Sequence, residues 1–388
     1  MNSHIDTKIT HCGRDSARQS LAVNPPLVRA STTVFGSLAA FRESYNGTTF
    51  ETPRYGRSGT STNFELQAAM ASICNTQSAI ATACGLSACA AVLGAYSEPN
   101  GQILMQNGVY GPTRALAERE LRRLNVQIDY FDNAQQLGAL LNSRSRLIFL
   151  EVPCSLSMQM LDVTAVCAIA KAHNIPVACD STWGTPIFFD AHKLGINISI
   201  HAATKYINGH SDTMLGLITG TYKDLQQTRD WCEHYGSHAA PDACWLTLRG
   251  LRTLSVRMQR HQENALQVAH WLQKQPQIKT LLFPALASDS GHELWKKQFS
   301  GAAGPFTIEL HACAQSRYEN CINTFKLFGL GTSLGGFESL VMPAIPHHLR
   351  AAKTLPDEGR LLRLHIGLEN PDELCTDLQR ALSQLNAE

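Results

Sequence analysis

Short apolar runs alternate with amphipathic segments between about residue 79 and residue 240. Runs that are apolar throughout predict strands covered on both faces of a sheet. They lie at residues 103–105, 126–131, 146–152, 176–180, 196–200 and 214–220. The intervening segments 112–124 and 162–173 predict helices. Strands that alternate with helices along a chain are typical of an α/β fold with a mostly parallel sheet, in which ligands bind beyond the carboxyl ends of strands.

The pattern differs before residue 61. Residues 1–60 are irregular and rich in Pro, Ser, Thr and Arg, which predicts an N-terminal arm rather than a domain. A helix is predicted to start near Thr62, because Thr62 and Glu65 have the spacing of a capping box. We therefore predict a boundary between the arm and a large domain at residues 61–240.

The pattern changes again after residue 240. A long helix is predicted over residues 241–275, with a break at Gly250, followed by strands at 305–310 and 362–366. The last helix has Asn370 as its cap and Pro371 at its first position. Residues 241–388 are therefore predicted to form a smaller C-terminal α/β domain.

Composition limits the partners of this chain. Its 388 residues carry 17 % charged side chains and a net charge of +1, which disfavours nucleic acid and anionic membranes as partners because both need a basic excess. Residues 79–96 are apolar enough to resemble a membrane span, but they consist mainly of Ala, Cys and Gly, and Gly85 divides them. We predict a strand, a glycine turn and a buried helix there, and no membrane partner.

Cysteine usage indicates a reducing compartment. The chain has twelve cysteines, and none are spaced as Cys-x-x-Cys. The start of the sequence lacks the apolar segment of a signal peptide. These features predict buried thiols, no metal site and a cytoplasmic location.

Two residues have the spacing and chemistry of a pyridoxal phosphate site. Asp180 ends one apolar run, and Lys205 follows the next. A lysine amine can bond the cofactor aldehyde, while a carboxylate pairs with the protonated ring nitrogen and keeps the ring an electron sink. If these two side chains meet, the site is catalytic.

Four further positions suit a site that holds this cofactor and its substrate, each with an ordinary structural alternative. Gly85 opens a helix whose free amides can bind phosphate, or it lies in a common strand–helix turn. Arg57 is either a phosphate ligand or part of a solvated basic loop. Tyr110 can cover a planar ring or pack in the core. Arg363, a lone cation in an apolar strand, binds a substrate carboxylate or a protein carboxylate.

Taken together, these segments resemble the Cys/Met-metabolism family of pyridoxal phosphate enzymes, which have fold type I. The likeness runs over nearly the whole chain and is strongest to the cystathionine β-lyases of that family. The motifs that carry it are Tyr55-Gly-Arg57-x-Gly-Thr, Ala203-Thr-Lys205-Tyr-x-x-Gly-His210-Ser-Asp212, Gly291-His-Glu-x-Trp295-Lys and Arg363-Leu-His-Ile-Gly-Leu-Glu369.

The resemblance implies a role for each matching residue. Lys205 would bond the cofactor and move the Cα proton, Asp180 would pair with the ring nitrogen, and Tyr110 would stack on the ring and assist proton movement. The phosphate ligands would be Gly85, Leu86 and Thr204 of one subunit, with Tyr55 and Arg57 of its neighbour. The substrate would contact Arg363, Ser333, Leu334 and Tyr55. A homodimer is then the minimal active unit, and a tetramer is the usual assembly.

The implied reaction is β-elimination from cystathionine or a related cysteine S-conjugate, which yields a thiol such as homocysteine, with pyruvate and ammonia. Leu334 stands where the best-known β-lyases have tryptophan, and Ser333-Leu-Gly-Gly is typical of γ-acting relatives. Glu151-Val-Pro-Cys lacks the Thr-Asn-Pro of γ-acting relatives, and the tail from Arg363 is β-lyase-like. A γ-synthase or γ-lyase reaction is the alternative, and a lyase-like regulatory binding protein is the alternative of another class.

Overall fold

The computed structural model describes residues 4–14, 22–46, 52–344 and 360–385. Its strands are β1 (Ser78–Thr82), β2 (Gln102–Gln106), β3 (Gln127–Phe131), β4 (Ser145–Glu151), β5 (Val177–Asp180), β6 (Ile198–Ala202), β7 (Gly216–Gly220), β8 (Ile278–Leu282), β9 (Pro305–Leu310), β10 (Gly329–Leu330), β11 (Leu340–Pro343) and β12 (Arg360–His365). Its helices are α1 (Ile5–His11), α2 (Leu38–Glu43), α3 (Ser61–Ile73), α4 (Gly85–Ala95), α5 (Gly111–Leu116), α6 (Ala134–Leu140), α7 (Val163–Ala172), α8 (Thr185–Phe188), α9 (Tyr222–Tyr235), α10 (Pro241–Leu251), α11 (Leu254–Leu272), α12 (His292–Gln298), α13 (Gln315–Thr324) and α14 (Pro371–Ser383), with short helical turns η1 (Gly56–Ser58) and η2 (Ala117–Leu121).

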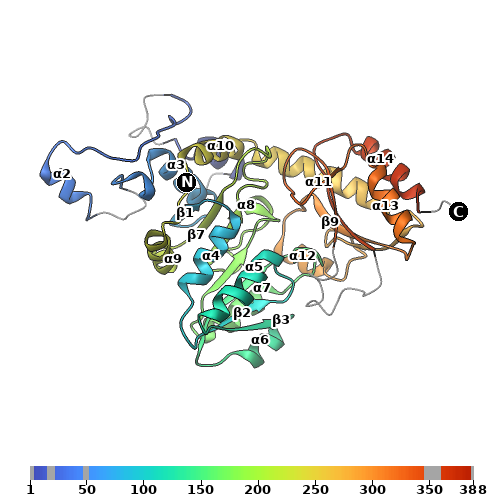
Figure 1. The fold of residues 1–388 in the computed structure, drawn as a ribbon, viewed down its shortest axis with the longest axis horizontal. Coiled ribbons are helices and arrows are strands. Elements are labelled where there is room, and N and C mark those ends of the chain that lie inside the picture. The colour runs from blue at the N-terminus through green and yellow to red at the C-terminus, as the bar shows by residue number, and fades with distance from the viewer. Residues whose placement is uncertain (1–3, 15–21, 47–51, 345–359, 386–388) are drawn as a thin grey trace.

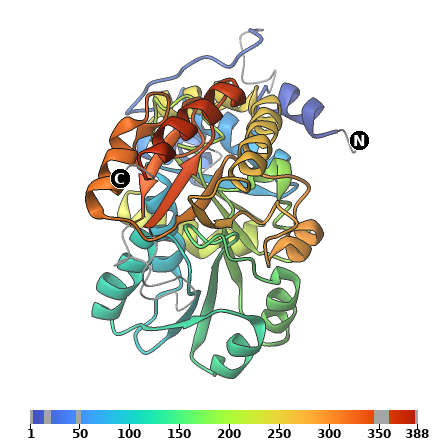
Figure 2. The same ribbon diagram turned by 90° about the vertical axis from the view of Figure 1, so that its right-hand side faces the viewer.

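The first sheet has seven strands in the order β1-β7-β6-β5-β4-β2-β3. Strands β2 to β6 run parallel, and β7 is antiparallel to both of its neighbours. Helices cover both sides of this sheet (Figure 2). Neighbouring residues of β4 point into two different cores, Leu147 and Phe149 into one and Ile148 and Leu150 into the other. This double burial explains the uninterrupted apolar runs and confirms the predicted α/β fold.

A second sheet lies at the C-terminal end of the molecule (Figure 1). Its strand order is β10-β11-β12-β9-β8, and all pairs except β10 with β11 are antiparallel. Helices α13 and α14 pack together beside it. Helix α11 contacts α1 and α8 and also contacts α14 and β8. One helix therefore links the two sheets.

The predicted domain boundaries at residues 60 and 240 stay predictions.

Several local predictions are confirmed. The predicted strand at residues 305–310 coincides with β9, and Asp162 caps α7 by accepting a hydrogen bond from Ala165 N–H at 3.0 Å. Asn370 caps α14 in the same way through Asp372 N–H at 2.9 Å. The predicted strand, turn and helix at residues 79–96 are β1 and α4. None of the helices in the described ranges combines the length and apolar character that crossing a bilayer requires.

One detail of the sequence interpretation was wrong, and another is confirmed. The capping box of α3 is formed by Thr60 and Asn63, because the Thr62 hydroxyl instead donates to Pro26 O at 3.0 Å and accepts from Val28 N–H at 2.9 Å. The long helix predicted from residue 241 with a break at Gly250 is confirmed as α10 and α11, which are separated just after Gly250. The arm also contains two short helices, α1 and α2, that its composition did not predict.

Candidate active site

Asp180 lies at the carboxyl end of β5, where parallel strands present their ends to a ligand. Its Oδ1 accepts hydrogen bonds from Thr182 N–H at 3.0 Å and from the Thr182 hydroxyl at 2.5 Å. The Thr182 Oγ1 in turn accepts from Ala202 N–H of β6 at 2.8 Å. Burial raises the pKa of Asp180, while the Thr182 bonds and the positive charge of Lys205 oppose the rise. One carboxylate oxygen is therefore held in a fixed orientation.

Lys205 follows β6, the strand next to β5 in the sheet. Its Nζ donates a hydrogen bond to Ser333 Oγ at 2.9 Å. Burial lowers the pKa of Lys205 and the Arg363 guanidinium lowers it further, whereas the carboxylates of Asp180 and Glu338 oppose the fall. The structure thus brings the two predicted residues into one electrostatic neighbourhood. A partly buried amine with a lowered pKa is suited to nucleophilic attack and proton transfer.

Arg363 is a buried cation on β12, only 5 % exposed. Its guanidinium donates to Thr332 O at 2.8 Å and to Ser333 O at 3.0 Å. Within the described ranges, no carboxylate forms a salt bridge with it. Burial lowers the pKa of Arg363, and Tyr110 and Glu151 are the groups that oppose the fall most. A buried guanidinium held by carbonyls alone keeps the capacity to bind a carboxylate.

Tyr110 lies beyond the end of β2, at the cap of α5. Its ring is 44 % exposed and its backbone N–H donates to Glu151 Oε2 at 2.6 Å. Burial raises the pKa of the Tyr110 phenol, which Arg363 opposes, so the phenol is protonated near neutral pH. Arg363 and Asp180 influence the pKa of both Tyr110 and Lys205, so the half-exposed Tyr110 belongs to the same electrostatic neighbourhood and is suited to cover a flat ligand there.

Glu151 is a member of this cluster that the sequence analysis did not assign to the site. It ends β4, directly beside Asp180 in the sheet register. Burial raises the pKa of Glu151 well above its ordinary value and Asp180 raises it further, while Tyr110 N–H and Arg363 oppose the rise. The sequence does contain a signal for this residue, because Glu151 stands near the end of the apolar run 146–152 as Asp180 does at the end of its own run.

The start of α4 offers donors for an anion. The N–H groups of Gly85 and Leu86 donate to no group in the part of the chain that the structure describes, since the first amides of a helix lack intrahelical partners. A Cβ added at Gly85 would lie 2.5 Å from the Ala202 Cβ, so this position excludes larger residues. The predicted third ligand, Thr204, has its hydroxyl on Leu215, accepting from N–H at 2.9 Å and donating to the carbonyl at 3.2 Å.

Tyr55 and Arg57 lie elsewhere on this chain. Arg57 donates to Glu233 O at the end of α9 at 3.1 Å, and Tyr55 is 51 % exposed. No described contact joins either residue to Lys205 or Asp180. Leu334, beside Ser333, is partly buried against the main hydrophobic core. The structure therefore gathers Lys205, Asp180, Tyr110, Arg363 and Ser333 but not the two arm residues.

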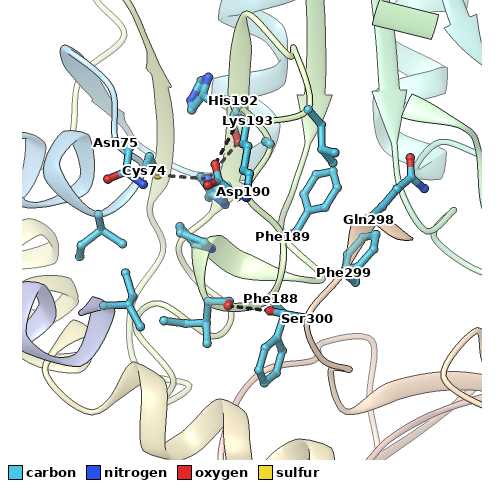
Figure 3. Close-up of a pocket in the computed structure, with 18 of the residues that line it drawn as sticks. Cys74, Asn75, Phe188, Phe189, Asp190, His192, Lys193, Gln298, Phe299 and Ser300 are labelled. Atoms are coloured by element: carbon cyan, nitrogen blue, oxygen red, sulfur yellow. Dashed lines mark hydrogen bonds between the residues drawn. The ribbon is translucent and has the colours of Figure 1, made fainter. Parts of the chain in front are cut away.

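A separate pocket of about 410 Å³ lies among α8, the connection to β6 and the end of α12 (Figure 3). Phe189 and Phe299 stack on one wall with ring centroids 4.5 Å apart, and Ser300 N–H donates to Phe188 O at 2.9 Å. None of the predicted site residues lines this pocket. It is distinct from the cluster around Lys205.

A family model for Cys/Met metabolism PLP-dependent enzymes matches residues 6–383. The chain belongs to this family. It is 34 % identical to a putative cystathionine beta-lyase from Rhizobium johnstonii over 100 % of this chain and 98 % of that protein. It is 35 % identical to the cystathionine beta-lyase MetC of Escherichia coli K12, with 98 % of each chain covered. Members of this family are enzymes that depend on pyridoxal phosphate, so this chain is an enzyme with pyridoxal phosphate as its cofactor.

Two further comparisons widen the range of related reactions. An L-alanine/L-glutamate racemase from Wolbachia pipientis wMel is 32 % identical over 94 % of this chain and 93 % of that protein. The crystal structure of metB from Corynebacterium glutamicum superposes with a TM-score of 0.90 at 26 % identity, covering 99 % of both chains. This likeness confirms the predicted fold type I architecture.

The residues fit the cofactor on structural grounds. The partly buried amine of Lys205 suits its aldehyde, the carboxylate of Asp180 suits its ring nitrogen, and the free amides of Gly85 and Leu86 suit its phosphate. When bound, pyridoxal phosphate supplies an electron sink for negative charge that develops at the substrate Cα. The chain would supply the groups that hold it and the groups that move protons.

Proposed function

We propose that this enzyme is a carbon–sulfur lyase that catalyses β-elimination from cystathionine or a related cysteine S-conjugate, giving a thiol, pyruvate and ammonia. The observation that carries removal of the substrate Cα proton, the step on which elimination depends, is the partly desolvated Lys205 amine, which donates to Ser333 and lies in the electrostatic neighbourhood of Asp180 and Arg363. The names of the relatives at 34 % and 35 % identity support the same reaction class.

The steps follow from the charges of this chain. Arg363 would bind the substrate carboxylate through the part of its planar fork that the Thr332 and Ser333 carbonyls leave free. This contact would direct the substrate Cα toward Lys205. The Lys205 Nζ would then take the Cα proton, which its lowered pKa favours because more of the amine is unprotonated.

Tyr110 would shield the reacting atoms. Its half-buried ring would cover the cofactor ring and exclude water, and Glu151 fixes the backbone that carries it. The protonated phenol would be a proton donor to the thiolate that leaves from the substrate Cβ.

A γ-acting reaction is the second candidate, supported by Leu334 in the Ser-Leu-Gly-Gly sequence that γ-acting relatives share. Leucine fills less space than tryptophan at this position, which would leave more room beside Ser333 for a longer reacting side chain. Removal of the Cα proton by Lys205 is common to both reactions, so the cluster itself favours neither.

Analysis of the keto acid separates the candidates. The purified enzyme is incubated with cystathionine, cystine and S-alkyl cysteines, and the products are identified. Pyruvate with homocysteine from cystathionine supports β-elimination. 2-Oxobutyrate with cysteine supports the γ reaction and contradicts our proposal. Negligible turnover of every thioether, together with tight capture of a protein partner, would instead support a regulatory binding protein.

We also propose that the active unit is at least a homodimer, with a tetramer as its assembly, in which Tyr55 and Arg57 reach the phosphate of the neighbouring subunit. The arm that leads to them extends away from the body of the chain (Figure 1). It exposes large apolar residues, with Val34 91 % and Leu38 62 % accessible. Exposed apolar side chains gathered on one extended segment favour burial against a partner. Light scattering of the wild-type enzyme measures the subunit number.

A further inference from the structure

The backbone of the loop between β10 and β11 rests directly on the catalytic lysine. Gly335 has φ of +80°, and a Cβ added there would lie 2.7 Å from Tyr206 N and 2.9 Å from Lys205 C. Two residues earlier, Ser333 Oγ accepts the hydrogen bond from Lys205 Nζ. Residues 332–336 therefore touch both the backbone and the amine of Lys205, and the orientation of that amine depends on where this loop lies.

Strand β12 holds the loop through two side chains on the same face of the strand. Arg363 donates to the carbonyls of Thr332 and Ser333. His365 accepts a hydrogen bond at its Nε2 from Gly335 N–H at 2.9 Å, and it is 1 % exposed. Arg363 has an evident role in substrate binding, whereas the reaction makes no direct use of His365.

The hydrogen bonds around His365 decide its tautomer. A backbone N–H can only donate, so the Nε2 that faces Gly335 carries no proton, although Gly336 O also lies 3.3 Å away. The proton of the neutral ring is then on Nδ1, which bonds to no described residue. The Nδ1 of the neighbouring His261 lies 2.8 Å from Ile366 O, so Nδ1 carries the proton and donates it to that carbonyl. The His261 Nε2 is then unprotonated and bonds to no described residue.

The surroundings oppose a positive charge on His365. The two imidazole rings lie 5.3 Å apart between centroids, and Tyr206 packs against both. Burial lowers the pKa of His365 well below its ordinary value, and His261, Arg363 and Lys205 lower it further, while Gly336 O opposes the fall. A protonated ring would also turn a donor toward the Gly335 N–H, which leaves that amide without an acceptor.

We propose that His365 is a positioning residue, which in its neutral Nδ1–H form anchors Gly335 and thereby keeps Ser333 Oγ at the Lys205 amine. The proposal rests on the catalytic role of Lys205 proposed above. It differs from a general packing role because it depends on one acceptor atom, the His365 Nε2. A side chain that supplies an acceptor there should substitute for the imidazole, and an apolar ring should not.

The test compares two variants of the holoenzyme with a matched control. His365→Phe keeps an aromatic ring but removes the acceptor, and His365→Gln supplies an amide oxygen at about the same reach. His261→Asn is the control, because it removes the adjacent buried imidazole while keeping a donor for Ile366 O. Hydrogen–deuterium exchange of the peptide that contains Gly335 is measured by mass spectrometry, alongside kcat and KM for the best thioether substrate.

In His365→Phe we expect exchange at Gly335 to rise about tenfold and kcat to fall about tenfold, since one buried hydrogen bond is lost. KM should change little, because Arg363 keeps its contacts. His365→Gln and His261→Asn should stay near the wild type in both measurements. Equal effects in all three variants would show a packing role, and unchanged exchange in a folded His365→Phe would show that Nε2 anchors nothing; either result overturns the proposal. The hydrogen–deuterium exchange measurement needs no turnover. It therefore tests the role of His365 even if the enzyme proves not to catalyse the proposed β-elimination.

Discussion

The amine of Lys205 donates a hydrogen bond to the hydroxyl of Ser333 across 2.9 Å, and these residues are 128 positions apart in the sequence. Lys205 follows a strand of the first sheet, and Ser333 lies between two strands of the second. The Lys205 amine therefore acquires this partner only when the segment after β6 and the loop between β10 and β11 come together in the folded chain. Variants that change Lys205 or the loop that carries Ser333 should therefore change the activity.

Replacing Lys205 by alanine should abolish turnover, with kcat lowered by about 10⁴-fold, because the group that takes the Cα proton is lost. The absorption band of the lysine-linked cofactor should disappear as well. Lys171→Ala, at an exposed position on α7, is the control and should keep both the band and the activity. Persistence of the band in Lys205→Ala would show that another amine binds the cofactor.

Replacing Arg363 by lysine should raise KM for amino-acid substrates by about 10²-fold, because an ammonium group cannot form the paired bonds of a guanidinium fork. The Thr332 and Ser333 carbonyls would also lose a donor. Initial rates over a range of substrate concentrations separate KM from kcat. A variant with unchanged KM and a lowered kcat would place the substrate carboxylate somewhere else.

Gly335→Ala should damage the site without removing any functional group. The added Cβ would lie 2.7 Å from Tyr206 N and 3.0 Å from Lys205 Cβ, at a φ of +80° that alanine rarely adopts. We expect the loop to move away from Lys205 and kcat to fall about tenfold or more. Gly331→Ala is the matched control in the same loop, because its nearest contact would be an ordinary 3.4 Å from a leucine methyl group. Equal loss in both variants would indicate a general effect on folding.

Glu151→Gln should make stability less dependent on pH. The pKa of Glu151 is raised in the folded enzyme, so the folded state binds this proton more tightly than the unfolded chain does. The free energy of unfolding of the wild type therefore falls as pH rises from the ordinary pKa of a glutamate toward the raised pKa of Glu151. Glutamine cannot ionise, and its amide oxygen can still accept from Tyr110 N–H.

The free energy of unfolding in urea, measured at about pH 5 and about pH 8, checks this prediction. The variant should gain stability over the wild type at the higher pH, and the difference should shrink at the lower pH. Glu43→Gln, at an exposed position of α2, should show no such trend. A loss of stability at the higher pH would mean that Glu151 is ionised and satisfied in the folded state.

The sequence by itself determined the local elements and the family. The apolar runs located the strands because both faces of the first sheet are buried, and Asp162 and Asn370 marked helix starts because capping depends on neighbours a few residues away. That Asp180 and Lys205 lie in one electrostatic neighbourhood could be anticipated, since adjacent parallel strands present their carboxyl ends at one edge. The cap of α3 was misplaced because Pro26 and Val28 of the arm engage Thr62.

Only the tertiary structure decided which distant groups complete the site. The contact of Glu151 with Tyr110, the bond from Lys205 to Ser333 and the support of Gly335 by His365 join residues 41, 128 and 30 positions apart. Such pairs follow from how the sheets and loops pack, which no local pattern records. Burial then sets the protonation of these groups, because it removes the water that would otherwise stabilise their charges.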